Sequence, residues 1–257
     1  MNYYPYGSYL QYLQASSSFL PSNISGLVLW YGSNIDGTIT RDGSNNISQW
    51  DDQALPAANA TATTTQRPTY VANQANGKAI ARFNGTANQM LISQSSSSSF
   101  TYCAVIKPTS AGERTIVGGN NNGIPALVVN NTQRLHLVRA FQAYLPVNST
   151  TALSTSAFNL AYATYDNATG NYGYYKNGSL DGSGTSAQAW TNGNFRIGAM
   201  TSSSFLNADL AELLVFNRAL NSTELNQIRD YQIIQYIGSI TRDGAGNPVL
   251  DGSKNFT

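Results

Sequence analysis

Three glutamates are the side chains with which this chain could hydrolyse a glycosidic bond. That reaction needs two carboxyl groups about 5 to 9.5 Å apart, one on each side of the bond. The only glutamates, Glu113, Glu212 and Glu224, fall in a predicted turn, a predicted strand and a predicted helix cap. Asp51 and Asp52 are adjacent, so their side chains diverge in an extended chain. A glycosidase is therefore the less favoured interpretation, and we expect no catalytic residue.

The single histidine and the single cysteine limit metal and nucleophilic chemistry. His136 has no orienting partner in the sequence, so we expect a histidine on a sheet face, and Cys103 in FTYCAVIKP is typical of a buried apolar position. One His and one Cys cannot form a His/Cys metal cluster. Calcium binds oxygen ligands, and Asp36, Asp42, Asp52 and Asp209 are weak candidates, although their spacing matches no EF-hand and turn formation is the simpler role. We expect no cofactor, with calcium as the open alternative.

Two aromatic residues in polar surroundings are candidates for binding sugars. Trp190 lies in AQAWTNGN and Tyr144 in FQAYLPVN, where a flat ring stands beside amide and hydroxyl side chains. A packing role is the alternative for Trp190.

The composition describes a neutral surface and excludes two classes of partner. Charged residues make up 11% of the 257, and 14 Lys and Arg oppose 13 Asp and Glu. No basic stretch is present to bind nucleic acid. The first residues do not resemble a signal peptide and no segment is apolar enough to span a membrane, so we expect a soluble protein of a virion surface or of the extracellular space.

The pattern of apolar residues predicts an all-β fold with one late helix. Runs of β-branched and aromatic residues separated by Gly, Asn and Ser clusters are typical of strands. The predicted strands are 27–31, 79–83, 100–107, 114–119, 126–130, 134–140, 158–166, 171–176, 195–200 and 209–216. A capping box at Asn221 and Glu224 starts the helix and Gly238 ends it, with Leu225, Ile228, Tyr231 and Ile234 against the strands. We expect two stacked antiparallel sheets closed by this helix.

The two ends of the chain differ from the middle. Residues 1–22 form a tyrosine-rich arm, 23–238 the sandwich, and 239–257 a hairpin tail in which Ile240 to Gly244 repeats the ITRDG of Ile39 to Gly43. An Asp-Gly turn explains both copies. We expect contacts with neighbouring subunits of a larger assembly at the residues Tyr3, Tyr4, Tyr6, Tyr9, Tyr12, Ile240, Arg242 and Val249. The arm lying on its own domain is the alternative.

The segments GLVLWYGSN, DGSNNISQWDD, RPTYVANQANGKAIARFNG, FTYCAVIKP, YYKNGSLDG, FRIGAM and ADLAELLVFNRALNSTELNQIRDYQIIQYIG occur in an order that resembles concanavalin A-like lectin/glucanase domains. They are most similar to the laminin-G and pentraxin-like branch of bacterial secreted and virion proteins. The resemblance implies a jelly-roll sandwich. The glucanase branch carries a Glu-x-Asp-x-Glu motif that this chain lacks. The leading hypothesis is a non-enzymatic structural or adhesion protein of a virion surface, capsid decoration or appendage, and the alternative is a carbohydrate-binding module for host or cell-surface glycans.

Overall fold

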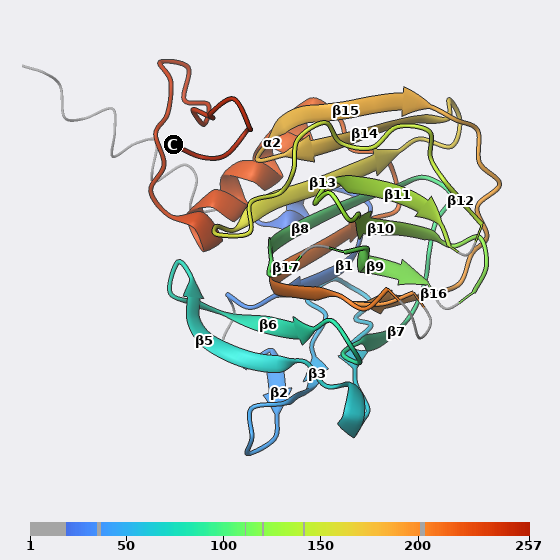
Figure 1. The fold of residues 1–257 in the computed structure, drawn as a ribbon, viewed down its shortest axis with the longest axis vertical. Helices are drawn as coiled ribbons and strands as arrows, with labels where there is room; N and C mark the ends of the chain where they lie inside the picture. The colour runs from blue at the N-terminus through green and yellow to red at the C-terminus, as the bar shows by residue number, and fades with distance from the viewer. Residues whose placement is uncertain (1–18, 35–36, 111, 120, 141, 201–203) are drawn as a thin grey trace, which may run out of the picture.

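The computed structural model describes residues 19–34, 37–110, 112–119, 121–140, 142–200 and 204–257. Two antiparallel sheets, sheet A and sheet B, lie face to face (Figure 1). Sheet A has the order β15-β14-β13-β8-β17-β6-β5, with β1 also paired to β17, and sheet B has the order β12-β11-β10-β9-β16-β7-β4-β3-β2. The fold class predicted from the sequence, a concanavalin A-like sandwich with one late helix, is confirmed.

The bounds of the sheet A strands are β1 Leu27–Gly32, β5 Thr69–Ala75, β6 Lys78–Asn84, β8 Phe100–Pro108, β13 Asn159–Tyr165, β14 Asn171–Lys176, β15 Ser179–Thr185 and β17 Asn207–Phe216. Those of sheet B are β2 Ile39–Arg41, β3 Ile47–Trp50, β4 Ala60–Thr61, β7 Met90–Ser95, β9 Arg114–Gly119, β10 Pro125–Val129, β11 Leu135–Arg139, β12 Ala143–Tyr144 and β16 Asn194–Ile197. The helical elements are η1 Pro21–Asn23, η2 Thr64–Gln66, α2 Ser222–Gln232 and the π-helical η3 Ile233–Ile237.

The central strands of sheet A, β8, β13 and β17, are buried on both faces, and this explains their apolar sequences. In β8, Tyr102 and Ala104 point into the core between the sheets, whereas Cys103 and Val105 point outward beneath the helix. A strand buried on both faces reads as a continuous apolar run rather than an alternating one. Cys103 is buried, as its surroundings in the sequence predicted.

The helix α2 covers the outer face of sheet A. The Asn221 side chain accepts a hydrogen bond from Glu224 N, and the Glu224 side chain accepts one from Asn221 N, so the predicted capping box is confirmed. Leu225, Ile228 and Tyr231 are buried against the sheet as predicted.

The prediction for Ile234 is wrong, because this side chain is 39% exposed. After Gln232 the helix widens into a π turn, in which Gly238 N donates to Ile233 O. The wider turn brings Ile233 and Tyr236 onto the sheet in its place.

Three turns of the chain share one structure with the sequence pattern Asp-Gly-x-x-Asn. They span residues 42–46, 243–247 and 251–255. In each turn the backbone N–H of the aspartate donates to the carbonyl of the asparagine four residues later, and the aspartate Oδ1 accepts from that asparagine's N–H. The two ITRDG copies lie at opposite ends of the molecule's long axis (Figure 1), so they are one local turn used separately.

Candidate functional site

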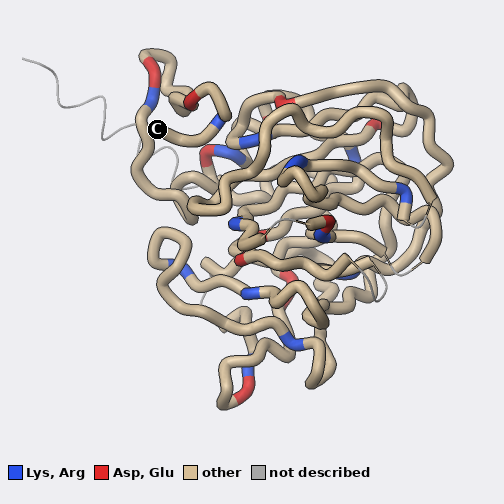
Figure 2. Tube along the Cα trace, viewed as in Figure 1, with Lys and Arg blue, Asp and Glu red and all other residues tan. Residues whose placement is uncertain are grey.

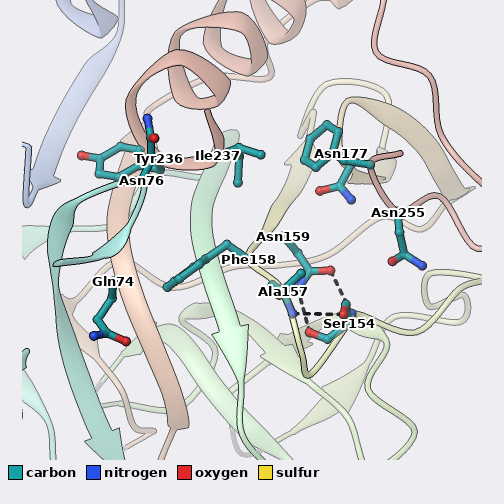
Figure 3. Close-up of a pocket in the computed structure, with 11 residues that line it drawn as sticks. Gln74, Asn76, Ser154, Ala157, Phe158, Asn159, Asn177, Tyr236, Ile237 and Asn255 are labelled. Atoms are coloured by element: carbon teal, nitrogen blue, oxygen red, sulfur yellow. Dashed lines mark hydrogen bonds between the residues drawn. The ribbon is translucent and has the colours of Figure 1, made fainter. Parts of the chain in front are cut away.

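A pocket of about 240 Å³ opens beside the end of the helix, on the outer side of sheet A (Figure 3). Its walls come from the β5–β6 turn, the loop before β13, the β14–β15 turn, the end of η3 and the tail. The lining residues are Gln74, Asn76, Ser154, Ala157, Phe158, Asn159, Asn177, Tyr236, Ile237, Asn255 and Phe256. Among these described residues none is charged.

The apolar part of the wall is largely aromatic. Phe158 and Phe256 are partly buried and pack on the cluster beneath the helix, and Figure 3 shows the Phe158 side chain extending between Gln74 and Asn159. The Lys107 Nζ atom lies 5.2 Å from the centre of the Phe158 ring. This contact holds the ring on one side.

Two of the lining carboxamides are fixed by the fold. The Asn159 Nδ2 atom donates to Ser154 O at 2.9 Å and to Ala157 O at 3.0 Å, while its Oδ1 accepts from Ser154 N. The Asn177 Oδ1 atom accepts from Leu160 N at 2.8 Å. These asparagines shape the loops around the pocket.

Two further side-chain amides, those of Asn76 and Gln74, lie on the opposite wall of the pocket. The Asn76 Nδ2 atom donates to Ile234 O at 3.2 Å, at the end of the helical segment. Gln74 is exposed and its Nε2 bonds to Ala72 O, within its own strand. A ligand can compete for a local bond of this kind at small cost, so Gln74 is the lining amide best able to contact a ligand.

The tail is held in place by buried polar contacts. The Lys176 side chain is fully buried, and its Nζ donates to Ala152 O, Ser253 O and Asn255 Oδ1. The Lys254 Nζ atom lies 2.9 Å from Asp181 Oδ1, and Asn177 Nδ2 donates to Lys254 O. The 251–255 turn therefore forms one wall of the pocket.

The structure does not bring the two predicted sugar-binding aromatics together in one contact. The Trp190 ring packs edge-on against Phe100, at 5.6 Å, and Tyr165, at 5.1 Å, on the rim of the core. Tyr144 lies on the edge strand β12, where its ring is tilted against that of His136 with the ring centres 4.9 Å apart, and its hydroxyl donates to Glu113. Burial and the Glu113 carboxylate raise the pKa of Tyr144 to about 12. Tyr144 is 48% exposed and stays a predicted contact.

The described aspartates among the calcium candidates each have their own partners. Asp42 accepts from its own turn and from Arg67, and the hydrogen bond from the Asn46 N–H is the largest cause that lowers its pKa. Asp52 accepts from three backbone N–H groups, and burial raises its pKa. Asp209 is buried between Arg82 and Lys107. Within the described ranges no three His, Cys, Asp or Glu residues cluster, and Asp36 lies outside them.

The three glutamates have separate structural surroundings. Glu212 is fully buried between β17 and the helix, where Trp30, Tyr231, Gln232 and Tyr236 donate hydrogen bonds to its carboxyl group. Burial raises the pKa of Glu212 to about 7. Glu224 pairs with Arg218 and Glu113 with Tyr144.

The tail residues that were predicted to contact neighbouring subunits also make contacts within their own chain. Ile240 packs against the cluster beneath the helix, and Arg242 donates to Gly246 O at 2.7 Å and lies 3.4 Å from Asp230. Val249 is partly buried and donates to Thr241 O. The arm residues Tyr3, Tyr4, Tyr6, Tyr9 and Tyr12 lie outside the described residues.

The pocket was not predicted from the sequence, because five separate segments form it. Phe158 was assigned to a strand, and it instead precedes β13 and faces the pocket. Gln74 belongs to a strand whose mixed polarity gave no signal. The asparagines that line the pocket were not singled out, because the many asparagines of the sequence were attributed to its overall composition and to turns.

Comparisons with known proteins agree with this architecture. The binding domain of Paraclostridial mosquitocidal protein 1 has a TM-score of 0.61 at 15% identity, covering 88% of this chain and 56% of that one. The receptor-binding domain of botulinum neurotoxin type G has a TM-score of 0.59 at 15% identity, covering 88% and 55%. A Trypanosoma rangeli sialidase has a TM-score of 0.57 at 15% identity, covering 84% and 34%.

This chain thus spans between about a third and just over half of these structures, and the likeness concerns the fold. No curated protein matches the sequence. No helix in the described part of the chain is long and apolar enough to cross a membrane. A family model described as "Concanavalin A-like lectin/glucanases superfamily" matches residues 83–226, more than half of the chain. The chain belongs to the concanavalin A-like lectin/glucanase superfamily.

Proposed function

We propose that the chain is a non-enzymatic adhesion domain that binds a neutral sugar in the pocket beside the helix. The observation that carries this proposal is the lining, in which aromatic rings stand beside carboxamides without a charged side chain. A carboxamide supplies both donors and acceptors to hydroxyl groups, and a ring face supplies apolar area. The lectin-like fold supports the proposal by analogy.

The size of the pocket limits the ligand. Pockets for drug-sized molecules hold roughly 300 to 1,000 Å³. At about 240 Å³, this pocket is smaller. We therefore expect it to bind one terminal sugar residue of a glycan, with the rest of the chain in solvent.

A glycan array followed by titration with the best ligand tests the proposal. We expect Phe158→Ala and Gln74→Ala each to weaken binding at least tenfold, or about 1.4 kcal/mol, because they remove the ring and the amide that is held only by a local bond. Gln94→Ala is the matched control, since Gln94 lies in β7 of the other sheet and also bonds locally. A thermal melt checks that each variant is folded.

Two results would contradict the proposed site. One is a wild-type protein that binds no glycan on a broad array. The other is binding that survives Phe158→Ala and Gln74→Ala but is lost on Tyr144→Ala or Trp190→Phe, which would move the site to those aromatics. Release of reducing ends from a polysaccharide panel would contradict the non-enzymatic part.

A second candidate function is a structural subunit of a virion surface or appendage. The neutral surface favours it: charged residues are few and scattered along the trace rather than gathered in one field (Figure 2). Such a surface associates with a neighbour without long-range repulsion. The two functions are compatible, because a surface subunit can also bind sugars.

A further inference from the structure

The buried amine of Lys176 touches the side-chain amide of a residue far away in the sequence. Lys176 ends β14, and Asn255 closes the last Asp-Gly-x-x-Asn turn, 79 positions later. The Lys176 Nζ atom lies 2.6 Å from Ala152 O, 2.7 Å from Ser253 O and 2.9 Å from Asn255 Oδ1. All three neighbours are uncharged acceptors.

Reaction at this amine requires its neutral form. The three oxygens accept the three N–H bonds of the ammonium form, so the amine must lose one proton before its lone pair can reach the Asn255 carboxamide. Burial lowers the pKa of Lys176, although Asp181 and Asp251 oppose that effect. A buried lysine whose amine loses its charge is an effective nucleophile.

A carboxylate lies on the other side of the same amide. The Asp251 Oδ2 atom accepts from Asn255 Nδ2 at 3.0 Å, and Asp251 Oδ1 accepts from the Asn255 backbone N–H at 2.9 Å. The carboxamide is thus fixed between an amine at its oxygen and a carboxylate at its nitrogen. Fixing reacting groups in contact can replace much of the entropy cost of a bimolecular reaction.

We propose that Lys176 and Asn255 join in an intramolecular isopeptide bond that anchors the tail to the sandwich. The neutral Nζ attacks Cγ of Asn255, and a new C–N bond forms. In this adduct both nitrogens are bonded to Cγ, so Asp251, which contacts Nδ2, can pass the proton lost by Nζ to Nδ2; the bond between Cγ and Nδ2 then breaks and ammonia leaves. The sum is one amine plus one primary amide giving one secondary amide plus ammonia, with no oxidant or reductant.

The other two Asp-Gly-x-x-Asn turns, residues 42–46 and 243–247, show how the surroundings of Asn255 differ from those of its counterparts. Asn46 and Asn247 occupy the same turn position and donate to Asp42 and Asp243 in the same way. The hydrogen bonds of the described residues place a lysine nitrogen on Asn255 alone among the three. The geometry therefore assigns the reaction to one turn and leaves two internal controls.

Peptide mapping of the full chain under denaturing conditions tests the bond. Trypsin does not cut after a lysine whose amine is acylated, and Lys176 is the only cleavage site between Arg139 and Arg196. We expect one branched species that joins residues 140–196 to residues 255–257, or to 243–257 where cleavage after Lys254 fails. Recovery of linear 140–176 and 177–196 from folded protein, after long incubation at neutral and mildly alkaline pH, would overturn the proposal.

The mass of the intact protein alone cannot identify the isopeptide bond. Asn-Gly pairs such as Asn177-Gly178 lose ammonia when they form a succinimide, and that product is linear. A mass loss carried only by linear peptides would therefore also overturn the proposal.

Variants separate the roles of the three residues. We expect Lys176→Arg and Asn255→Ala to abolish the branched peptide, Asp251→Ala to slow its formation at least tenfold, and Asn247→Ala to leave it unchanged. Equal rates and yields of the branched peptide in Asp251→Ala and wild type would show that Asp251 takes no part in the reaction. A branched peptide that persists in Asn255→Ala would exclude Asn255 as the partner.

Discussion

At the scale of single residues, Glu212 is the most unusual group in the molecule. It carries a carboxyl group on a fully buried strand position, and a β-bulge in β17 places it there. The bulge lies between Leu210 and Glu212, so Ala211 and Glu212 both face the helix rather than alternating. Four hydrogen-bond donors satisfy the carboxyl group, but burial outweighs them and raises its pKa to about 7.

The Glu212 pKa predicts a pH dependence of stability. Since the pKa rises from 4.5 in the unfolded chain to about 7 in the folded protein, the native state holds the proton more tightly. Its contribution to stability is complete below pH 4.5 and is lost as the pH rises through 7, in total about 3 kcal/mol. We expect urea unfolding at pH 5 and pH 8 to show a loss in wild type that Glu212→Gln largely removes.

Glu224→Gln is the control of opposite sign. Arg218 lowers the pKa of Glu224, so its contribution to stability is present at neutral pH and is lost as the pH falls through the folded pKa. The neighbours Cys103, Tyr162, Tyr231 and Tyr236 have pKa values raised by burial and stay neutral in this range. Equal slopes in wild type and Glu212→Gln between pH 5 and pH 8 would refute the assignment.

At the scale of elements, the helix depends on its first turn. The Asn221 side chain and Glu224 satisfy each other's backbone N–H groups at 3.0 Å. We expect Asn221→Ala to lower the free energy of unfolding by about 1 kcal/mol, because it leaves an amide without its partner. Gln227→Ala, on the exposed side of the same helix, is expected to have no such effect, and equal losses in both variants would contradict a specific role for the cap.

The elements also show what the sequence could and could not predict. Strands buried on both faces, such as β8 and β13, were predicted almost to the residue, because apolar runs of this length have few other uses. β5, β7 and β15 are among the strands that were missed: β5 is mostly polar, every second residue of β7 is exposed, and β15 contains two glycines and few apolar residues. The π turn at Ile233 depends on packing against the sheet, and helical periodicity therefore placed Ile234 wrongly.

The candidate site was harder to predict than the fold for a physical reason. Core positions follow a local pattern of apolar residues that can be recognised in the sequence. The pocket instead forms where residues far apart in the sequence, such as Gln74, Phe158 and Asn255, meet in the fold. Aromatic residues in polar surroundings were the available signal, and it led to Trp190 and Tyr144. The structure places Trp190 on the core rim and Tyr144 on an edge strand.

At the scale of the whole molecule, assembly can be separated from folding. The described chain begins at Phe19, which packs against the cluster beneath the helix, so a chain of residues 19–257 retains this contact. If the arm mediates assembly, we expect the full chain to form oligomers in light scattering and the 19–257 chain to be monomeric with the same melting temperature. Equal masses for both chains would exclude the arm as a subunit contact in solution.

The position of β17 has a consequence for how the protein is made. This strand pairs with β8, β6 and β1, although it is the last strand of sheet A in the sequence. A nascent chain leaving the ribosome therefore exposes β8 and β6 without the strand that lies between them until β17 has emerged. Pairings of such long sequence separation form slowly. Closure of the sandwich therefore waits for the last strand of sheet A, and we expect the growing chain to depend most on chaperones before that strand is available.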